Sequence, residues 1–270
     1  MGMGISRREL ILYAALAASG ALMACGPLAA QSAPPRRLAQ IQPEAWQIVV
    51  LANQARAAQG APPLQWDPAL AAAARQHCLR MAQEGPIAHR YGDEADLGDR
   101  AGQAGAHFSL IEENVAIGPS PAAIHDEWMH SEGHRTNMLN PNIDRVGVAL
   151  VASRGVLYAV ADYAKGVPVL TREQVEARIA ALVRVSGVAP RSNPADARTA
   201  CAMDRGVPLA SAGQQPGFVM RWQDANVTRL PQKLVDQLAS GQYREAAIGS
   251  CPAQYVEGAF TVYRVAVLLY

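Results

Sequence analysis

Histidine is the residue type in this chain best suited to chemistry, and all six histidines fall between positions 77 and 134. Imidazole changes its charge near neutral pH and is a common metal ligand, so a reactive or metal-binding site is expected in this segment. One stretch, His130-Ser131-Glu132-Gly133-His134, is superficially similar to a zinc-protease helix motif, in which two histidines four apart flank a glutamate. In that motif the glutamate follows the first histidine directly, whereas here Ser131 does. We therefore expect no protease helix of this kind.

Ser131 precedes His134 by three residues, which makes it a candidate nucleophile. The sharp glycine-flanked turn that exposes a catalytic serine in acyl-transfer enzymes does not surround it, so a capping role is the more natural interpretation. His77 and His125 lie beside apolar helix stripes and are expected to be satisfied core or surface groups. His107 follows a glycine-rich stretch and is expected in a loop.

Helices are predicted on both sides of these residues. An apolar pattern of helical period runs from Pro43 to Gln59 and ends at Gly60, with Trp46 on its apolar face. Asp67-Pro68 and Ser120-Pro121 each place a capping side chain before a proline in the first turn, where the missing N–H costs nothing. These signals predict two further helices that begin at those points.

A hairpin is predicted after the last histidine. The helix from Pro121 is expected to end at Gly133, and two β-rich runs within residues 145–163 flank Ser153-Arg154-Gly155. Helices packed on a short antiparallel sheet form an α+β domain or a three-layer sandwich.

The rest of the chain predicts a second, smaller α+β module. Thr171 and Gln174 form a capping-box pattern that opens a helix, and residues 188–196, which contain two prolines, are predicted to be a linker. No internal repeat is evident. The predicted boundaries are a domain at 43–166, a helix and linker at 167–196, and the module at 197–270, with strand-like runs at 218–222, 243–251 and 259–270 and a helix that begins at Pro231.

Composition excludes several classes of protein. Of the 270 residues, 50% are apolar and 17% are charged, which excludes a disordered chain. The formal net charge of +1 lacks the surplus of lysine and arginine that a nucleic-acid binder needs to neutralise phosphates. Aromatic residues are only 6%, which also argues against a platform for stacking single-stranded bases.

The N-terminus resembles an export signal. Arg7-Arg8 precede an apolar run from Leu10 to Ala24, which is shorter than the roughly 20 residues of a membrane-spanning helix and is similar to a twin-arginine signal. Leu22-Met23-Ala24-Cys25-Gly26 resembles a lipobox, which makes Cys25 the expected lipidation site. The alternative is an ordinary signal peptide cleaved near Ala30. In both cases residues 1–30 are a signal segment and 31–42 a tether, and the mature chain is extracytoplasmic, either lipid-anchored in the bacterial cell envelope or periplasmic.

The cysteines are consistent with export. Cys201 and Cys251 both lie in the predicted C-terminal module, and an oxidising compartment would allow a disulfide between them. Such a bond closes a loop of about 50 residues and would stabilise the module by about 4 kcal/mol in the chain-entropy model. Cys78 lies on an apolar helix stripe and is expected to be a buried small hydrophobe.

Several short motifs follow one another in a fixed order over about 120 residues, from Trp46 to Ala164. Together they resemble the bacterial branch of the CAP superfamily, which comprises cysteine-rich secretory proteins, antigen 5 and pathogenesis-related 1 proteins. The motifs are Asn53-Gln54-Ala55-Arg56, Gly60 to Leu70, Glu113-Asn114-Val115-Ala116, Trp128 to Leu139, and Asn140 to Val148, with His89 between the second and the third.

The resemblance implies an α-β-α sandwich with a central cleft where two histidines and acidic residues converge. Matched by motif, the histidines are His89 and His134, and the first acid is Glu113. The family often has a second glutamate three residues after the motif tryptophan, and here that position holds Ser131. A mechanism that needs paired carboxylates therefore lacks one of them.

Two imidazoles and one carboxylate suggest three kinds of role. His89, His134 and Glu113 form a ligand set that can hold zinc tetrahedrally with one position open, and neutral imidazole suits nickel and copper as well. The same side chains without a metal could act as general acid and base, with Ser131 as a further catalytic candidate. The third possibility is a hydrogen-bonded polar network that locks the helices together.

We therefore predict an exported, lipid-anchored CAP-domain protein that is an envelope binding module rather than an enzyme. Its histidine-containing cleft would bind zinc or another divalent metal. The expected partners are a membrane, through the lipid anchor, and a lipid, peptide or other envelope component, but not nucleic acid. The alternative is a metal-dependent hydrolase that acts on an envelope polymer or peptide.

Overall fold

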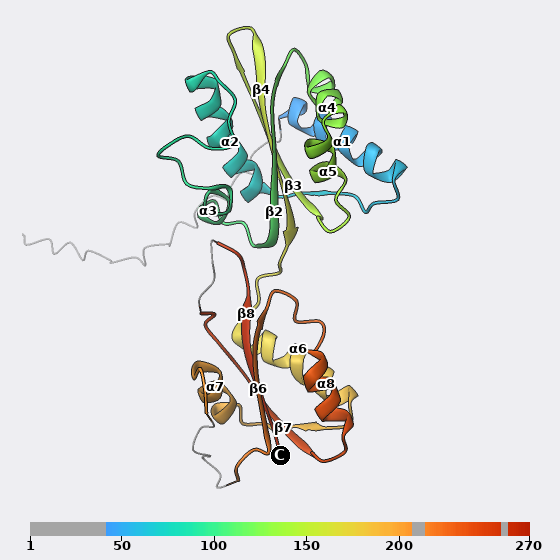
Figure 1. Ribbon diagram of the computed structural model, residues 1–270, viewed down its shortest axis with the longest axis vertical. Coiled ribbons are helices and arrows are strands. Elements are labelled where there is room, and N and C mark those ends of the chain that lie inside the picture. The colour runs from blue at the N-terminus through green and yellow to red at the C-terminus, as the bar shows by residue number, and fades with distance from the viewer. Residues whose placement is uncertain (1–41, 207–213, 255–258) are drawn as a thin grey trace, which may run out of the picture. The chain divides into compact units, whose positions relative to one another are not determined.

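The computed structural model describes residues 42–206, 214–254 and 259–270. The predicted signal segment, the lipobox with Cys25, and nearly all of the tether lie outside these residues. Within the described ranges, no helix combines the length and apolar character needed to cross a membrane. The described chain forms two α+β units (Figure 1), which we treat one at a time.

The first unit is a four-stranded sheet between two helical layers. Its strand order is β1-β3-β4-β2, in which β1 and β3 are parallel and β4 is antiparallel to both β3 and β2. The first helical layer contains α2 and α3, and the second contains α1, α4 and α5 (Figure 1). This is the predicted α-β-α sandwich. The elements are α1 (Pro43–Ala58), β1 (Gln65–Trp66), α2 (Pro68–Glu84), α3 (Leu97–Gln103), β2 (Phe108–Gly118), α4 (Pro121–His130), α5 (Glu132–Leu139), β3 (Arg145–Ser153) and β4 (Val156–Gly166).

The predicted helix starts are confirmed, because their capping side chains satisfy backbone N–H groups that have no partner within the helix. The Asp67 carboxylate accepts from the N–H groups of Ala69 and Leu70, and the Ser120 hydroxyl accepts from Ala123. The predicted hairpin is confirmed as well: Arg154 and Gly155, with φ of 52° and 79°, form the turn between β3 and β4. Gly155 fits this left-handed backbone at little cost, since it has no Cβ.

Two sequence predictions in this unit were wrong in detail. The helix is interrupted at Ser131, an extended residue that ends α4 and precedes α5. Gly133 therefore lies inside α5 and does not end the preceding helix. Trp46 is 48% exposed and does not face the core, whereas Ile48, Val49 and Ala52 are buried on α1. The helical period therefore located the helix and most of its apolar face correctly, but it placed Trp46 wrongly on that face.

The core of the α1 layer contains a buried tryptophan and a buried cation. Trp128 is fully buried, and its indole N–H donates to the carbonyl of Val115, 3.2 Å away, as expected for a core anchor. Arg56 is also fully buried and donates to the carbonyl oxygens of Pro62, Met138, Asn140 and Ile143 at 2.7–3.1 Å. These contacts fix the position of α5 and of the segment that leads from it into β3.

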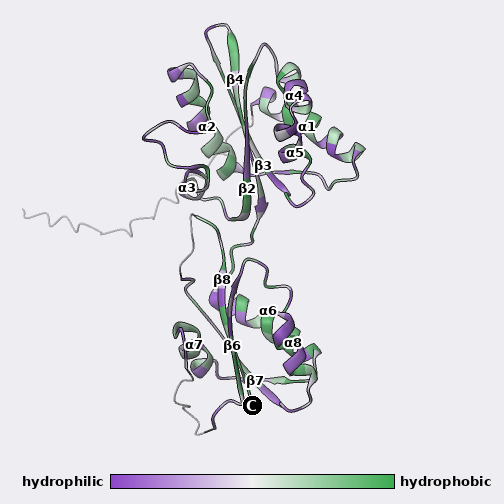
Figure 2. Cartoon of the chain, viewed as in Figure 1, coloured by the Kyte–Doolittle hydropathy of each residue, from purple (hydrophilic) through white to green (hydrophobic). Residues whose placement is uncertain are grey.

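The second unit is again a four-stranded sheet with helices on both faces, in the order β5-β7-β8-β6. Helices α6 and α8 pack on one face and α7 on the other (Figure 1). In both units, hydrophobic residues are frequent on the strands, and the helices carry both hydrophobic and hydrophilic residues (Figure 2). The elements are α6 (Arg172–Val185), β5 (Ala189–Pro190), α7 (Ala195–Ala202), β6 (Phe218–Asp224), α8 (Gln232–Ala239), β7 (Glu245–Cys251) and β8 (Tyr263–Leu269).

The predicted linker at residues 188–196 is not a linker. Its first part is β5, which pairs with β7, and its last residues begin α7. The capping box at Thr171 is present, and α6 buries Val175 and Ile179 in the core of this unit. The second unit therefore begins near residue 171. The two prolines of this segment are tolerated, one in a two-residue edge strand and one at the start of a helix.

The disulfide prediction is confirmed: Cys201 on α7 is bonded to Cys251 on β7, with their Cα atoms 5.8 Å apart. Cys78 is a buried free thiol on α2, and burial raises its pKa to about 12. At that pKa the thiol is not a nucleophile at neutral pH, which agrees with the expectation of a core residue.

Candidate functional site

The site begins with an ion-paired carboxylate on β2. Glu113 is almost fully buried, with a side chain 3% exposed, whereas the side chain of His89 is 61% exposed. Nδ1 of His89 lies 2.9 Å from Oε1 of Glu113, and Nη2 of Arg100 donates to Oε2 at 2.6 Å. Both carboxylate oxygens are therefore engaged. One of them orients the imidazole of His89, and Nε2 of that ring remains available for a ligand.

The loop that carries His89, between α2 and α3, is held by buried polar groups. His77 is fully buried on α2, and its two ring nitrogens lie 2.8 Å from Oε1 of Glu94 and 2.8 Å from the carbonyl oxygen of Ala88. Arg100 also donates to the carbonyl of His89 at 3.2 Å. His77 is thus a satisfied core histidine, as expected, and together with Arg100 it fixes the backbone next to His89.

A second carboxyl group lies beside Glu113. Asp162 on β4 is the cross-strand partner of Glu113 and is fully buried. Burial raises the pKa of Asp162 well above its usual range, the negative charge of Glu113 raises it further, and Arg100 opposes the shift. The protonated form is therefore favoured in the folded protein. This carboxyl group occupies a part of the site where the sequence motifs predicted none.

His134 enters the site from α5. The Nδ2 group of Asn114 donates to the carbonyl oxygen of His134 at 2.9 Å, and the Nδ2 group of Asn137 donates to Oδ1 of Asn114 at 3.1 Å. These two asparagines tie β2 to α5. Nδ1 of His134 is buried and has no hydrogen-bond partner among the described residues. An unsatisfied ring nitrogen of this kind is available to a ligand or to a water molecule.

The two histidines have pKa values shifted in opposite directions. The hydrogen bond to Glu113 is the main cause that raises the pKa of His89, and burial and Arg100 oppose it. Burial is the main cause that lowers the pKa of His134, and the positive charge of His89 lowers it further. Between the two pKa values, the site therefore holds a cationic His89 and a neutral His134.

We expect nuclear magnetic resonance to show this order directly. In a pH titration of the ring C–H signals, the midpoint of His89 should lie above that of His134. Glu113→Gln should lower the midpoint of His89, since a neutral amide no longer favours the imidazolium. The His89–Glu113 pair stabilises the fold fully below the unfolded pKa of histidine, and this contribution is lost as the pH rises through the raised folded pKa. Equal midpoints in the unmodified protein would contradict this description of the site.

The three side chains do not form a three-ligand metal site in this arrangement. No group of three or more His, Cys, Asp or Glu side chains is placed to share one ion among residues 42–206, 214–254 and 259–270. The reason lies in Glu113, whose oxygens are used by Arg100 and His89. A carboxylate that accepts the Nδ1–H of a histidine is, however, a common support for a metal-binding imidazole. In this arrangement Glu113 supports His89 and would not itself be a ligand.

The remaining sequence candidates lie elsewhere. The backbone of Ser131 caps the break between α4 and α5, but its side chain makes no capping hydrogen bond. His130 is the last residue of α4 and is exposed, and His107 immediately precedes β2. Nε2 of His125, on α4, is buried with no hydrogen-bond partner in the described part of the chain, and burial lowers the pKa of this residue.

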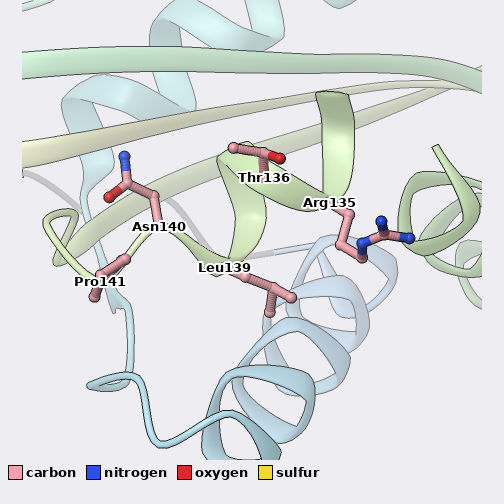
Figure 3. Close-up of a pocket in the computed structure, with 5 residues that line it drawn as sticks. All are labelled: Arg135, Thr136, Leu139, Asn140 and Pro141. Carbon is pink, nitrogen blue, oxygen red and sulfur yellow. The ribbon is translucent and has the colours of Figure 1, made fainter. Parts of the chain in front are cut away.

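A pocket of about 440 Å³ lies at the C-terminal end of α5. Figure 3 shows its lining side chains, which come from α5 and the loop that follows it. Nδ2 of Asn140 in this lining also donates to Oε1 of Glu112 at 2.9 Å. Neither His89 nor His134 belongs to the lining, which consists of Arg135, Thr136, Leu139, Asn140 and Pro141.

Sequence reasoning missed Arg100, Glu94 and Asp162. Asp162 carried a usable signal, because an acid inside an otherwise apolar strand must be buried and therefore paired or protonated. Arg100 and Glu94 lie in a polar stretch where charged residues are ordinary. Their roles follow from a loop path that no local pattern specifies.

Comparison with known proteins agrees with the fold and the motifs. The model of the cysteine-rich secretory protein (CAP) family matches residues 50–163. The chain is 34% identical over 110 residues to the uncharacterized protein YkwD of Bacillus subtilis strain 168, which covers 40% of this chain and 43% of that protein. It is 32% identical over 106 residues to the uncharacterized membrane protein YlbC of the same strain, which covers 38% and 30%. The chain thus spans less than half the length of these curated relatives.

Among solved structures, the chain resembles an extracellular protein containing an SCP domain from Bacillus anthracis strain Ames. The identity is 28% and the TM-score is 0.43, with 45% of this chain and 40% of that chain covered. The family match and the predicted motifs occupy the same segment, which forms the first sandwich of the structure. Residues 50–163 therefore belong to the cysteine-rich secretory protein family and form a CAP domain.

Proposed function

We propose that this protein is an exported binding module of the bacterial cell envelope, held on a membrane by lipid on Cys25, that recognises its ligand through His89 and His134. The observation that carries the proposal is the engagement of Glu113. Both of its oxygens are used by Arg100 and His89, so this acid positions an imidazole and is not free to act on a substrate. Export is supported by the twin arginines, by the lipobox and by membership of a secretory protein family.

Catalysis is less well supported by the same residues. A general base must be able to take a proton, and Glu113 can do so only by giving up a contact with Arg100 or His89. Asp162 is sealed from solvent, and its protonated form is favoured. Ser131 lies at a helix break and is not supported by an adjacent base in the hydrogen bonds of the described residues. We therefore favour binding over hydrolysis.

A divalent ion would be held by the two imidazoles. His89 would contribute Nε2, because its Nδ1 faces Glu113, and His134 would be the second ligand. When bound, such an ion would supply a positive charge that attracts an anionic or carbonyl group of an envelope ligand. Arg100 would hold the Glu113 side chain in place.

Zinc titration of the purified full chain tests the site. We expect one equivalent of zinc to bind the unmodified protein, and His134→Gln to weaken that binding at least 10-fold. His130→Gln is the matched control, because His130 is an exposed histidine four residues away that lies outside the site. Equal zinc affinity in the two variants would contradict the assignment. Zinc-dependent hydrolysis of isolated host cell-wall material that disappears in His134→Gln would instead establish the hydrolase alternative.

Cell fractionation tests the anchor. In the native host, the unmodified protein should sediment with the membranes, whereas Cys25→Ala should be found in the soluble or secreted fraction, since a lipid chain supplies most of the membrane affinity of an anchored protein. Cys78→Ala, which removes a buried thiol, is the control and should stay with the membranes. Unchanged membrane association of Cys25→Ala would show that another feature holds the protein.

A further inference from the structure

The two units of this chain repeat one element order. The first runs α1-β1-α2-β2-α4-β3-β4 and the second α6-β5-α7-β6-α8-β7-β8; among the described residues, only α3 and α5 have no counterpart. In both sheets a two-residue first strand is parallel to the third, and the fourth strand pairs antiparallel with the third and the second. Within each unit, the first and third helical positions share one face of the sheet and the second takes the other (Figure 1).

The strand registers align the two units residue by residue. Gln65 of β1 pairs with Arg145, and Ala189 of β5 pairs with Glu245, so Arg145 corresponds to Glu245. The flanking hydrogen bonds agree, because the N–H of Asp67 donates to Val146 and that of Arg191 donates to Ala246. The same alignment extends along the paired strands. It makes the pair Val151–Tyr158 equivalent to the pair Cys251–Arg264. It also makes the pair Glu113–Asp162 equivalent to the pair Val219–Leu268.

Contacts between the helices and the sheets agree with this alignment. They are independent of it, because the strand registers alone define the alignment. The Sγ atom of Cys78 on α2 lies 3.1 Å from the carbonyl oxygen of Tyr158. The Sγ atom of Cys201 on α7 lies 3.5 Å from the carbonyl oxygen of Arg264, which is the equivalent position. Two cysteines on two helices thus contact the same place in the two sheets.

The segments before the short strands also correspond. α1 and α6 are each followed, two residues after their end, by a left-handed glycine, Gly60 at φ 71° and Gly187 at φ 82°. A buried aliphatic residue then immediately precedes the short strand in each unit, Leu64 in one and Val188 in the other. A shared order of strands could arise twice, but shared registers, helix contacts and turns together favour a common origin.

We infer that residues 172–270 are a second, shortened copy of the CAP fold formed by residues 43–166, and that this copy has lost the ligand site. Val219 and Leu268 replace Glu113 and Asp162, and the sequence has no histidine after position 134. In the shorter copy, the disulfide from Cys201 to Cys251 joins helix to sheet where the first copy has only the contact of Cys78 with Val151 and Tyr158. A covalent bond offsets the smaller core of a small unit.

Transplanting the disulfide tests the inference on the full chain. Val151 corresponds to Cys251, so Val151→Cys should form a second disulfide with Cys78. After oxidation, peptide mapping without reduction should show a linked pair and a loss of the free Cys78 thiol, and mapping separates both from Cys25. Ala152→Cys is the matched control: it changes the next, exposed residue on the opposite face of β3 and should leave Cys78 free. If the oxidised, folded Val151→Cys protein is then unfolded in urea and Cys78 is still alkylated, the equivalence is overturned.

The reciprocal exchange covers the case in which Val151→Cys does not fold. In Cys251→Val, the second copy has a cysteine on its helix and a valine on its strand, as the first copy has at Cys78 and Val151. We expect its Cys201 thiol to be protected from alkylation in the native chain at least 100-fold relative to the urea-unfolded chain, as we expect for the buried Cys78. Rapid alkylation of Cys201 in this native variant would show that α7 does not pack as α2 does, and the inference would fail.

Discussion

Replacing Arg56 with methionine should lower the free energy of unfolding of the CAP domain by about 3–5 kcal/mol. Methionine can fill much of the space, but it leaves four carbonyl oxygens without their donor. The hydrogen bonds to Met138 and Ile143 are buried, and those to Pro62 and Asn140 are partly buried. The expected decrease in the free energy of unfolding is large because these carbonyl oxygens lose a charged donor. Hydrogen bonds to a charged donor are stronger than neutral ones.

Urea unfolding followed by tryptophan fluorescence would measure this change, because Trp128 is buried in the same core. Arg75→Met is the control, since Arg75 is exposed on α2 and its replacement should leave the unfolding midpoint nearly unchanged. A midpoint for Arg56→Met as high as that of Arg75→Met would mean that water or another donor satisfies these carbonyls.

Arg100→Met should destabilise the domain by a similar amount, about 3–5 kcal/mol, for an electrostatic reason. Arg100 is the cation that contacts Glu113, and Asp162 lies beside that pair with no exposure to solvent. Without the guanidinium, the negative charge of Glu113 remains buried with only the exposed His89 to balance it. Arg100 also holds the backbone carbonyl of His89, so the loop between α2 and α3 should become more mobile.

A second variant distinguishes destabilisation by an unbalanced buried charge from destabilisation by loss of packing. Arg100→Met combined with Glu113→Gln removes both members of the ion pair, and it should recover part of the stability lost in Arg100→Met. Arg80→Met removes two ion pairs at the surface, with Glu84 and Asp93, and should change the unfolding midpoint very little. Strict additivity of the Arg100 and Glu113 changes would show that the pair contributes no coupling energy.

Much of the CAP domain could be predicted from local patterns. The caps at Asp67 and Ser120, the glycine that follows α1 and the turn at Arg154-Gly155 are each specified by a few neighbouring residues, because capping and turn geometry depend on backbone contacts within four positions. The ordered motifs led to the family and, through it, to His89, Glu113 and His134. The order of the motifs along the chain was enough to propose these three residues.

Local patterns were insufficient where distant residues decide the outcome. Val188 to Asp196 has the prolines of a linker, yet β5 and α7 form there because β7 supplies a strand edge and the core of the second unit buries the helix. Trp46 faces solvent because the sheet beneath α1 accepts the neighbouring residues Ala45, Ile48 and Val49. Burial depends on what lies opposite, which periodicity does not specify.

By itself, the sequence predicted the family of residues 50–163 and the two cysteines that pair, and it proposed His89, Glu113 and His134 for the site. The tertiary structure alone decided that Glu113 holds His89 while Arg100 holds Glu113, that Asp162 stands beside them, and that one fold occurs twice in the chain. The physical reason is that ion pairs and strand registers join residues tens of positions apart, so their partners are set by chain path, whereas caps, turns and motifs are set by neighbours. After the two copies diverged, the ladders and helix contacts persisted because they require backbone geometry and buried volume more than particular side chains.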